Sequence, residues 1–164
     1  MIEHVVSRVS AVVSDVYVSA NTPEDYAFLG LPVITDRIKG IGPLGGIHAA
    51  LTECASDYIL IVACDLPFLS ENLLRFICKD VGRKDIVAFE SKTGVEPLCA
   101  VYAKTCLPAI NEAVAAKQYA VIDLFSKVKT RIITHDDLDL PASTFLNINT
   151  PQDLTDAEEA SGPR

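Results

Sequence analysis

The sequence predicts an α/β domain built in three layers, with helices on both faces of a mostly parallel sheet. Short apolar runs alternate along the chain with segments of helical periodicity, which is typical of β-α-β-α connections. The run at 58–63, Y-I-L-I-V-A, is nearly all apolar and predicts a strand buried on both faces. With 164 residues, 49% of them hydrophobic, the chain can bury one core. We expect a single domain over residues 1–160 and a frayed tail at 161–164.

The first half of the pattern opens with a helix, because apolar residues at 2, 5, 6, 9, 12 and 13 share one helical face. Apolar strands at 15–20 and 31–35 follow, and they end at Asn21 and Asp36. A glycine-rich stretch from Gly40 to Gly46 then opens an apolar-periodic helix that reaches about residue 55. The strand at 58–63 ends in the sequence C-D-L-P.

In the second half, Ser70 is placed to cap a helix that runs to about residue 81. Strands are predicted at 86–89, 97–102 and 131–134, with helices at 107–117 and 121–128 between the last two. A strand at 145–148 and a helix from Pro151 complete the pattern. A doubly wound domain ordinarily begins with a strand, whereas this chain begins with a helix. Either a usual first strand is missing or the fold differs from the usual one.

Charge and cysteine usage limit the classes of partner. Lys and Arg number 14 against 22 Asp and Glu, a net charge of -8, and no basic cluster offers a face for nucleic acid. No apolar run reaches the ~20 residues of a membrane span, and no signal peptide is expected. The five cysteines form no C-x-x-C pair, which favours a reducing cytoplasm without structural zinc.

Polar residues follow three of the predicted strands, at Asn21, Asp36 and Asp65. Because ligands of open α/β sheets bind beyond the carboxyl ends of the strands, these residues predict a binding crevice. Asp65 carries the sharpest signal, since Pro67 ends its strand and a carboxylate with phosphate oxygens and water is the usual Mg²⁺ arrangement. For each residue, a purely local turn remains the alternative.

The glycine-rich stretch allows close backbone approach at the start of a helix and so predicts an anion site. It is not a Walker loop, because no G-K-[ST] follows. Gly40, Gly42 and Gly45 do form a G-x-G-x-x-G, and Asp65 lies near the spacing of a ribose-binding acid. A nicotinamide-dependent oxidoreductase is therefore an alternative, although 36–39 separates the glycines from the preceding strand.

Three further residues are candidates for substrate contact. Glu96 opens a strand and could face the crevice, or it could be a surface acid. Asn147 and Asn149 would project to one side of an extended segment and offer amides to a polar heterocycle, unless they only form a turn. No nucleophile is expected, because Ser19 has no predictable histidine partner and Cys64 and Cys99 fall in apolar strands.

Six segments occur in an order that resembles a known family. They are V-Y-V-S-A-N, V-I-T-D, G-P-L-G-G-I-H-A-A-L, V-A-C-D-L-P-F-L, E-P-L-C-A-V-Y and F-L-N-I-N-T-P-Q-D-L. They resemble the molybdenum cofactor guanylyltransferases, which make molybdopterin guanine dinucleotide, over nearly the whole chain. The G-P-L-x-G block differs in related cytidylyltransferases. The resemblance implies a Rossmann-like, three-layer sheet of the nucleotide-diphospho-sugar transferase type.

The resemblance also implies a reaction and roles. The molybdopterin phosphate attacks the α-phosphate of GTP, and pyrophosphate leaves. Asn21 and Asp36 match positions that hold the guanine nucleotide, and Asp65 matches the Mg²⁺-binding, catalytic aspartate. Asn147 and Asn149 match the side that receives the pterin phosphate. The loop beside the base is matched by Gly42, Pro43, Leu44 and Gly46.

The chain departs from the family at its start. The family begins with a strand and a loop, L-A-G-G-x-S-x-R-M-G-x-x-K, which wraps the triphosphate and which this sequence lacks. That strand is central in the family, so we expect a gap in the sheet, with exposed edges that invite self-association or a partner chain. Two interpretations stay open: a guanylyltransferase impaired by the missing loop, and a non-catalytic GTP- or cofactor-binding remnant that acts through a partner.

Overall fold

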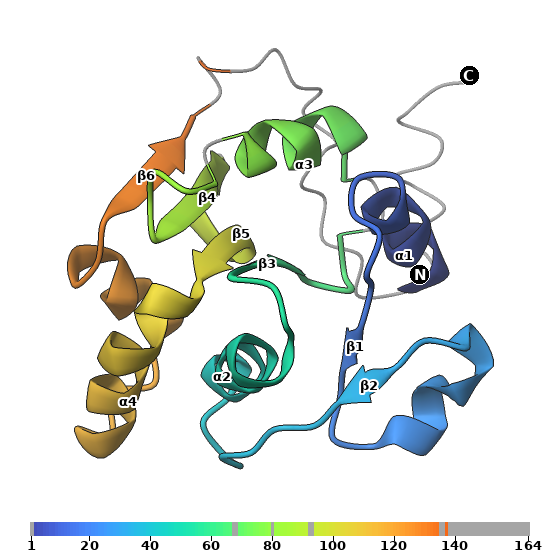
Figure 1. The fold of residues 1–164 in the computed structure, drawn as a ribbon, viewed down its shortest axis with the longest axis horizontal. Helices are drawn as coiled ribbons and strands as arrows, with labels where there is room; N and C mark the ends of the chain where they lie inside the picture. Colours follow the sequence, from blue (N-terminus) through green and yellow to red (C-terminus); the bar gives the residue numbers. More distant parts are fainter. Residues whose placement is uncertain (1, 67–68, 80, 92–93, 135–136, 138–164) are drawn as a thin grey trace.

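In the computed structural model, the strands of the described residues lie in two sheets (Figure 1). The structure describes residues 2–66, 69–79, 81–91, 94–134 and 137. The smaller sheet pairs β1 (Val18–Ser19) with β2 (Val33–Ile34) in parallel. In the larger sheet the order is β3 (Tyr58–Val62), β5 (Gly94–Ala103), β4 (Ile86–Ser91) and β6 (Thr130–Ile133). Only β5 runs against its neighbours there, which agrees with a mostly parallel sheet.

Seven helices are described. Six of them lie where the sequence predicts a helix or directly beside it, although the segment at 121–128 is a 3-10 helix instead of an α-helix. The helix at Pro23–Leu29 has no buried residue, so it carries no apolar periodicity by which it could be predicted. The helices are α1 (Ile2–Ser10), η1 (Pro23–Leu29), α2 (Pro43–Glu53), α3 (Glu71–Cys78), η2 (Lys104–Cys106), α4 (Leu107–Ala115) and η3 (Val121–Ser126).

The predicted cap of the helix after Ser70 is present in position only, and two predicted elements near the end of the chain cannot be compared with the structure. Ser70 occupies the N-cap position of α3, but its side chain makes no capping hydrogen bond. The strand predicted at 145–148 and the helix predicted from Pro151 lie outside the described residues. Among the described residues, no helix is long and apolar enough to cross a membrane.

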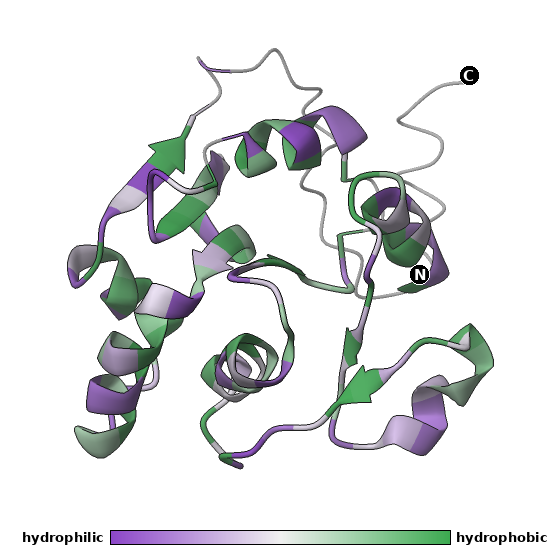
Figure 2. Ribbon diagram, in the orientation of Figure 1, coloured by the Kyte–Doolittle hydropathy of each residue, from purple (hydrophilic) through white to green (hydrophobic). Residues whose placement is uncertain are grey.

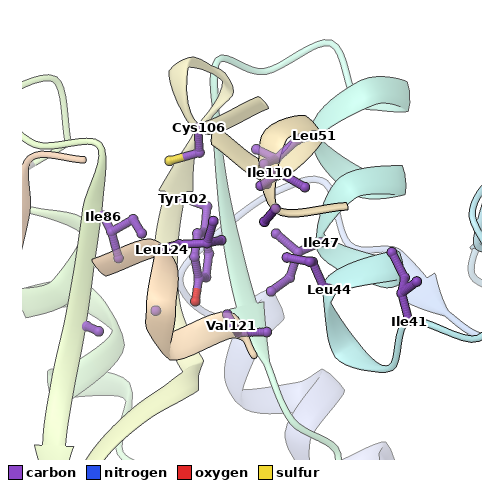
Figure 3. Close-up of a cluster of buried hydrophobic side chains, with 13 residues drawn as sticks. Ile41, Leu44, Ile47, Leu51, Ile86, Tyr102, Cys106, Ile110, Val121 and Leu124 are labelled. Atoms are coloured by element: carbon purple, nitrogen blue, oxygen red, sulfur yellow. The ribbon is translucent and has the colours of Figure 1, made fainter. Parts of the chain in front are cut away.

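Helices cover both faces of the larger sheet, which confirms the three-layer prediction. On one face, α2, α4 and η3 pack against Ile86 and Tyr102 around a core cluster drawn in Figure 3. On the other face, α3 packs against Val87 and Phe89, and valines of the α1 segment adjoin the same cluster. Figure 2 shows β1 and β2 in the green of apolar residues, while much of the neighbouring η1 is purple.

A cavity of about 800 Å³ separates β1 from β3. Within the described residues, β3 pairs with β5 alone, and its side chains are half-buried. The prediction that the 58–63 strand is buried on both faces is therefore wrong. The physical reason is that one edge of β3 borders the cavity instead of another strand, so its apolar side chains keep part of their surface accessible. The gap expected in the sheet lies here.

Strand β5 changes register where it passes the end of β3. Ala88 pairs with Ala100, but the next residue of β4, Phe89, pairs with Glu96. The three residues between bulge away from β4, and the first of them, Pro97, has no N–H to contribute to a ladder. The buried Tyr102 hydroxyl donates to the Pro97 carbonyl oxygen at 2.7 Å, which holds the bulge from beneath.

At the opposite end of the sheet, Asp85 joins three segments just before β4. Its carboxylate accepts a hydrogen bond from the Thr105 hydroxyl at 2.6 Å and another from the Lys129 N–H at 2.9 Å. The Thr105 hydrogen bond, joined by that of Lys129, holds the pKa of Asp85 below its usual range. A group with a lowered folded-state pKa stabilises the fold at neutral pH and loses this effect in acid.

We expect Thr105→Val to lower the free energy of unfolding at pH 7 by about 1 kcal/mol, because a partly exposed charged hydrogen bond is lost. The deficit should shrink as the pH falls below about 4, where Asp85 of the unfolded chain takes up a proton. Urea denaturation of the variant and the wild type at several pH values measures this difference in the free energy of unfolding. The matched control is Thr52→Val, whose hydroxyl bonds the His48 carbonyl of its own helix. Deficits of equal pH dependence in both variants would contradict this account.

Candidate functional site

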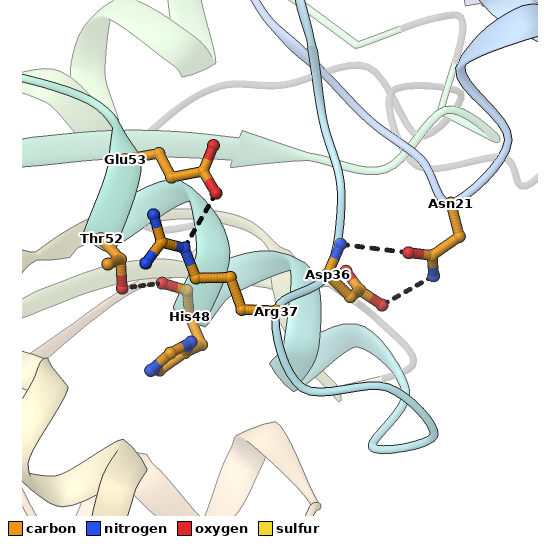
Figure 4. Close-up of polar contacts among 6 residues, drawn as sticks. All are labelled: Asn21, Asp36, Arg37, His48, Thr52 and Glu53. Carbon is orange, nitrogen blue, oxygen red and sulfur yellow. Dashed lines mark hydrogen bonds and ion pairs between the residues drawn. The ribbon is translucent and has the colours of Figure 1, made fainter.

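The carboxyl ends of β1 and β2 meet at the cavity. Asn21 and Asp36 follow these strands, and both line the cavity. The Asn21 amide nitrogen donates to Asp36 Oδ2 at 2.9 Å, and the Asp36 backbone N–H donates to Asn21 Oδ1 at 3.1 Å (Figure 4). This two-bond pairing fixes the orientation of both side chains. The parallel pairing of β1 with β2 brings them together, since Ala20 N–H donates to the Ile34 carbonyl between them.

The first turn of α2 packs against Asp36 and also lines the cavity. Gly42 precedes the helix with φ 60°, a backbone conformation that glycine adopts at little cost, and Pro43 is its first residue. Both line the cavity together with Gly46. Leu44 points away into the core and is fully buried, so it anchors the turn. All four residues predicted for the loop beside the base therefore belong to this turn or support it.

Two glycines of α2 let the helix approach the strand ends. A Cβ at Gly45 would lie 3.0 Å from both Asp36 Oδ2 and the Ile38 carbonyl oxygen. A Cβ at Gly46 would lie 2.7 Å from Ser19 Oγ and 3.7 Å from Asp36 Oδ1. Real Cβ contacts are rarely this short, so a side chain at Gly45 would force α2 away from the Asn21–Asp36 pair, whereas one at Gly46 would displace the Ser19 side chain.

Asp65 lies just beyond the cavity. Cys64, the residue before it, lines the cavity and is exposed in the turn after β3. Asp65 itself is half-buried and does not line the cavity. No group of three or more His, Cys, Asp or Glu residues that could hold a metal occurs among the described residues.

Of the three residues predicted to contact the acceptor, the structure describes Glu96. Glu96 is half-buried on β5 and accepts a hydrogen bond from Ser91 Oγ at 2.6 Å. It does not line the cavity, whereas Leu98, two residues further along the bulge, does. Asn147 and Asn149 lie outside the described residues.

The structure places the two cysteines considered as nucleophiles differently. Burial raises the pKa of Cys99 to about 12 and that of Cys106 to about 11, so neither ionises near neutral pH. Cys64 was expected in an apolar strand but is exposed after β3, because the strand ends at Val62. Ser19 lines the cavity and was missed as a site residue. Its spacing of two from Asn21, on an extended segment, was the signal that could have found it.

Comparison with known proteins now identifies the family. Residues 1–130 match the MobA-like NTP transferase domain. The chain is 37% identical over 156 residues to a probable molybdenum cofactor guanylyltransferase of Carboxydothermus hydrogenoformans, spanning 93% of this chain and 79% of that protein. The chain belongs to the molybdenum cofactor guanylyltransferase family. Its members are nucleotidyltransferases, so the family and enzyme class predicted from the six sequence segments are confirmed.

Two further members of this family extend the comparison. A molybdenum cofactor guanylyltransferase of Desulfosudis oleivorans is 36% identical over 164 residues, covering 98% of this chain and 81% of that one. The crystal structure of molybdopterin-guanine dinucleotide biosynthesis protein A from Archaeoglobus fulgidus matches with a TM-score of 0.78 at 25% identity, covering 98% of this chain and 84% of that chain. The predicted fold class is confirmed, and the oxidoreductase alternative suggested by the glycine spacing is not supported.

We expect Gly45→Ala to destabilise the protein by about 1–2 kcal/mol, although alanine is intrinsically the better helix former. The added Cβ meets the Ile38 backbone carbonyl, which cannot rotate away. Thermal unfolding measures the change, and a melting temperature equal to or above that of the wild type would contradict it. Gly46→Ala is the matched control, because its closest contact is the rotatable Ser19 side chain and its cost should be smaller.

Proposed function

We propose that this chain transfers GMP from GTP to molybdopterin, forming molybdopterin guanine dinucleotide and pyrophosphate. An oxygen of the molybdopterin phosphate attacks the α-phosphorus of GTP. The bond from that phosphorus to the bridging oxygen breaks, and pyrophosphate leaves with the electron pair. The observation that carries the proposal is the Asn21–Asp36 pair at the cavity wall in a chain of this family.

Asp36 is suited to hold a guanine base. A carboxylate only accepts hydrogen bonds, and the pairing edge of guanine offers N1–H and 2-amino donors. The hydrogen bond from the Asn21 amide nitrogen keeps Asp36 Oδ2 in place. The hydrogen bond from the Asp36 backbone N–H to Asn21 Oδ1 keeps the residue itself in place. The base is therefore met by an acceptor that is already oriented, which lowers the entropy lost on binding.

The donor set at Asp65 fits a divalent cation, and we propose Mg²⁺. One half-buried carboxylate directly after a strand suits an ion that takes one or two protein carboxylates and completes its shell with phosphate oxygens and water. When bound, such an ion neutralises charge that develops on the phosphates during transfer. Asp65 is the residue of this chain that would hold it.

The acceptor side rests on Glu96, Asn147 and Asn149, which we propose to contact the molybdopterin phosphate and pterin. The hydrogen bond from Ser91 orients the Glu96 carboxylate at the start of the bulge.

The proposed location of the reaction is a reducing cytoplasm. All five cysteines are free, which supports this location.

Asp65→Asn tests this function. We expect the wild-type chain to show a Mg²⁺-dependent thermal shift with GTP but not with ATP, CTP or NADH, and to form molybdopterin guanine dinucleotide. The variant should lose product formation by at least about 100-fold, since the metal-binding charge is gone. The matched control is Asp57→Asn, an exposed carboxyl just before the other end of β3. GTP binding without any product in the wild type would instead support the non-catalytic remnant, and no GTP shift would refute both.

We further propose that the chain self-associates through strand edges. Among the described residues, β1 pairs only with β2 and β3 only with β5, so each leaves a row of backbone N–H and C=O groups unpaired. Such edges are templates for another strand. Light scattering during size-exclusion chromatography should show a species larger than the 17.7 kDa monomer. A clean monomer across the concentration range would refute this proposal and leave the guanylyl transfer untouched.

A further inference from the structure

Ser19 stands in the same wall as the Asn21–Asp36 pair and has no role so far. It lines the cavity at the end of β1, two residues before Asn21. Its hydroxyl faces the first turn of α2, since Oγ lies 2.7 Å from the point where a Gly46 Cβ would be. Asp36 Oδ1 lies 3.7 Å from that same point. The hydroxyl and the carboxylate therefore both approach α2 at Gly46, and both residues line the cavity.

The Ser19 hydroxyl is also uncommitted. Asn21 and Asp36 are bonded to each other. By contrast, no hydrogen bond joins Ser19 Oγ to any residue within the part of the chain that the structure describes. Ser19 is exposed into the cavity, so its hydroxyl can turn toward a ligand without breaking an existing bond. A hydroxyl both donates and accepts, whereas the neighbouring carboxylate only accepts.

We propose that Ser19 donates a hydrogen bond to the O6 oxygen of the guanine base, beside the donors that Asp36 accepts. This rests on the proposed function. On the pairing edge of guanine, the O6 acceptor adjoins the N1–H donor, and the 2-amino donor follows. Asp36 can satisfy the two donors but repels the oxygen. Ser19 lines the same cavity as Asp36 and carries an uncommitted donor, so the two residues together match the whole edge.

The test is Ser19→Ala, with binding measured by calorimetry for two nucleotides that share O6 and differ in the 2-amino group. These are GTP and inosine triphosphate. A third ligand, 2-aminopurine riboside triphosphate, lacks O6. We expect the variant to bind GTP and inosine triphosphate more weakly by the same factor, about 3- to 10-fold, which is typical of one neutral hydrogen bond. Its affinity for the 2-aminopurine nucleotide should equal that of the wild type.

The outcomes separate this inference from the proposed function. Unchanged GTP affinity in Ser19→Ala, with normal binding by the wild type, would overturn the role of Ser19 and leave guanylyl transfer standing. A loss for GTP without a loss for inosine triphosphate would move the contact to the 2-amino group and so overturn the O6 contact. Absence of GTP binding in the wild type would overturn both. Ser126→Ala, whose hydroxyl bonds the Asp123 carbonyl far from this wall, controls for the loss of a serine.

Discussion

The close approach of α2 to the ends of β1 and β2 is the constraint on which the candidate site depends. The approach is possible because Gly45 and Gly46 present only backbone to Asp36 and Ser19. The buried Leu44 holds the turn against the core, so the distance is set by packing and not by the polar groups themselves. Polar side chains at the strand ends are thus oriented before any ligand arrives, which is what a selective base site requires.

The two ends of the larger sheet differ in what their residues contact. At the amino-terminal edge of β4, Asp85 ties neighbouring segments together through hydrogen bonds that all close within the protein. At the other end, β5 changes register beside Phe89, and Leu98 of the bulge lines the cavity. The internal hydrogen bonds of Asp85 and the cavity therefore lie at opposite ends of the sheet, and ligands of such sheets generally bind at the carboxyl ends of the strands.

Much of this arrangement was predictable from the sequence, and the failures have physical causes. Strong apolar patterns located the strands and the larger helices, and strand-end polarity located Asn21 and Asp36. The half-buried state of β3 was not predictable from its composition, because burial depends on which strands flank it. The spacing of Ser19 from Asn21 places both on one side of an extended segment, but the closeness of Ser19 to α2 depends on the packing of Gly46 and was not predictable from the sequence. The η1 helix has no buried residue, so its sequence shows no apolar periodicity that could predict it.

The one-sided pairing of β3 gives its backbone two classes of amide. In an antiparallel pair, successive residues alternate between those whose N–H and C=O face the partner strand and those that face away. Along Tyr58–Val62 the first class is bonded to β5, while the second faces the cavity. Hydrogen exchange along this single strand should therefore alternate between slow and fast from one residue to the next. The exchange pattern of this edge strand thus reports, residue by residue, whether the space beside it is filled.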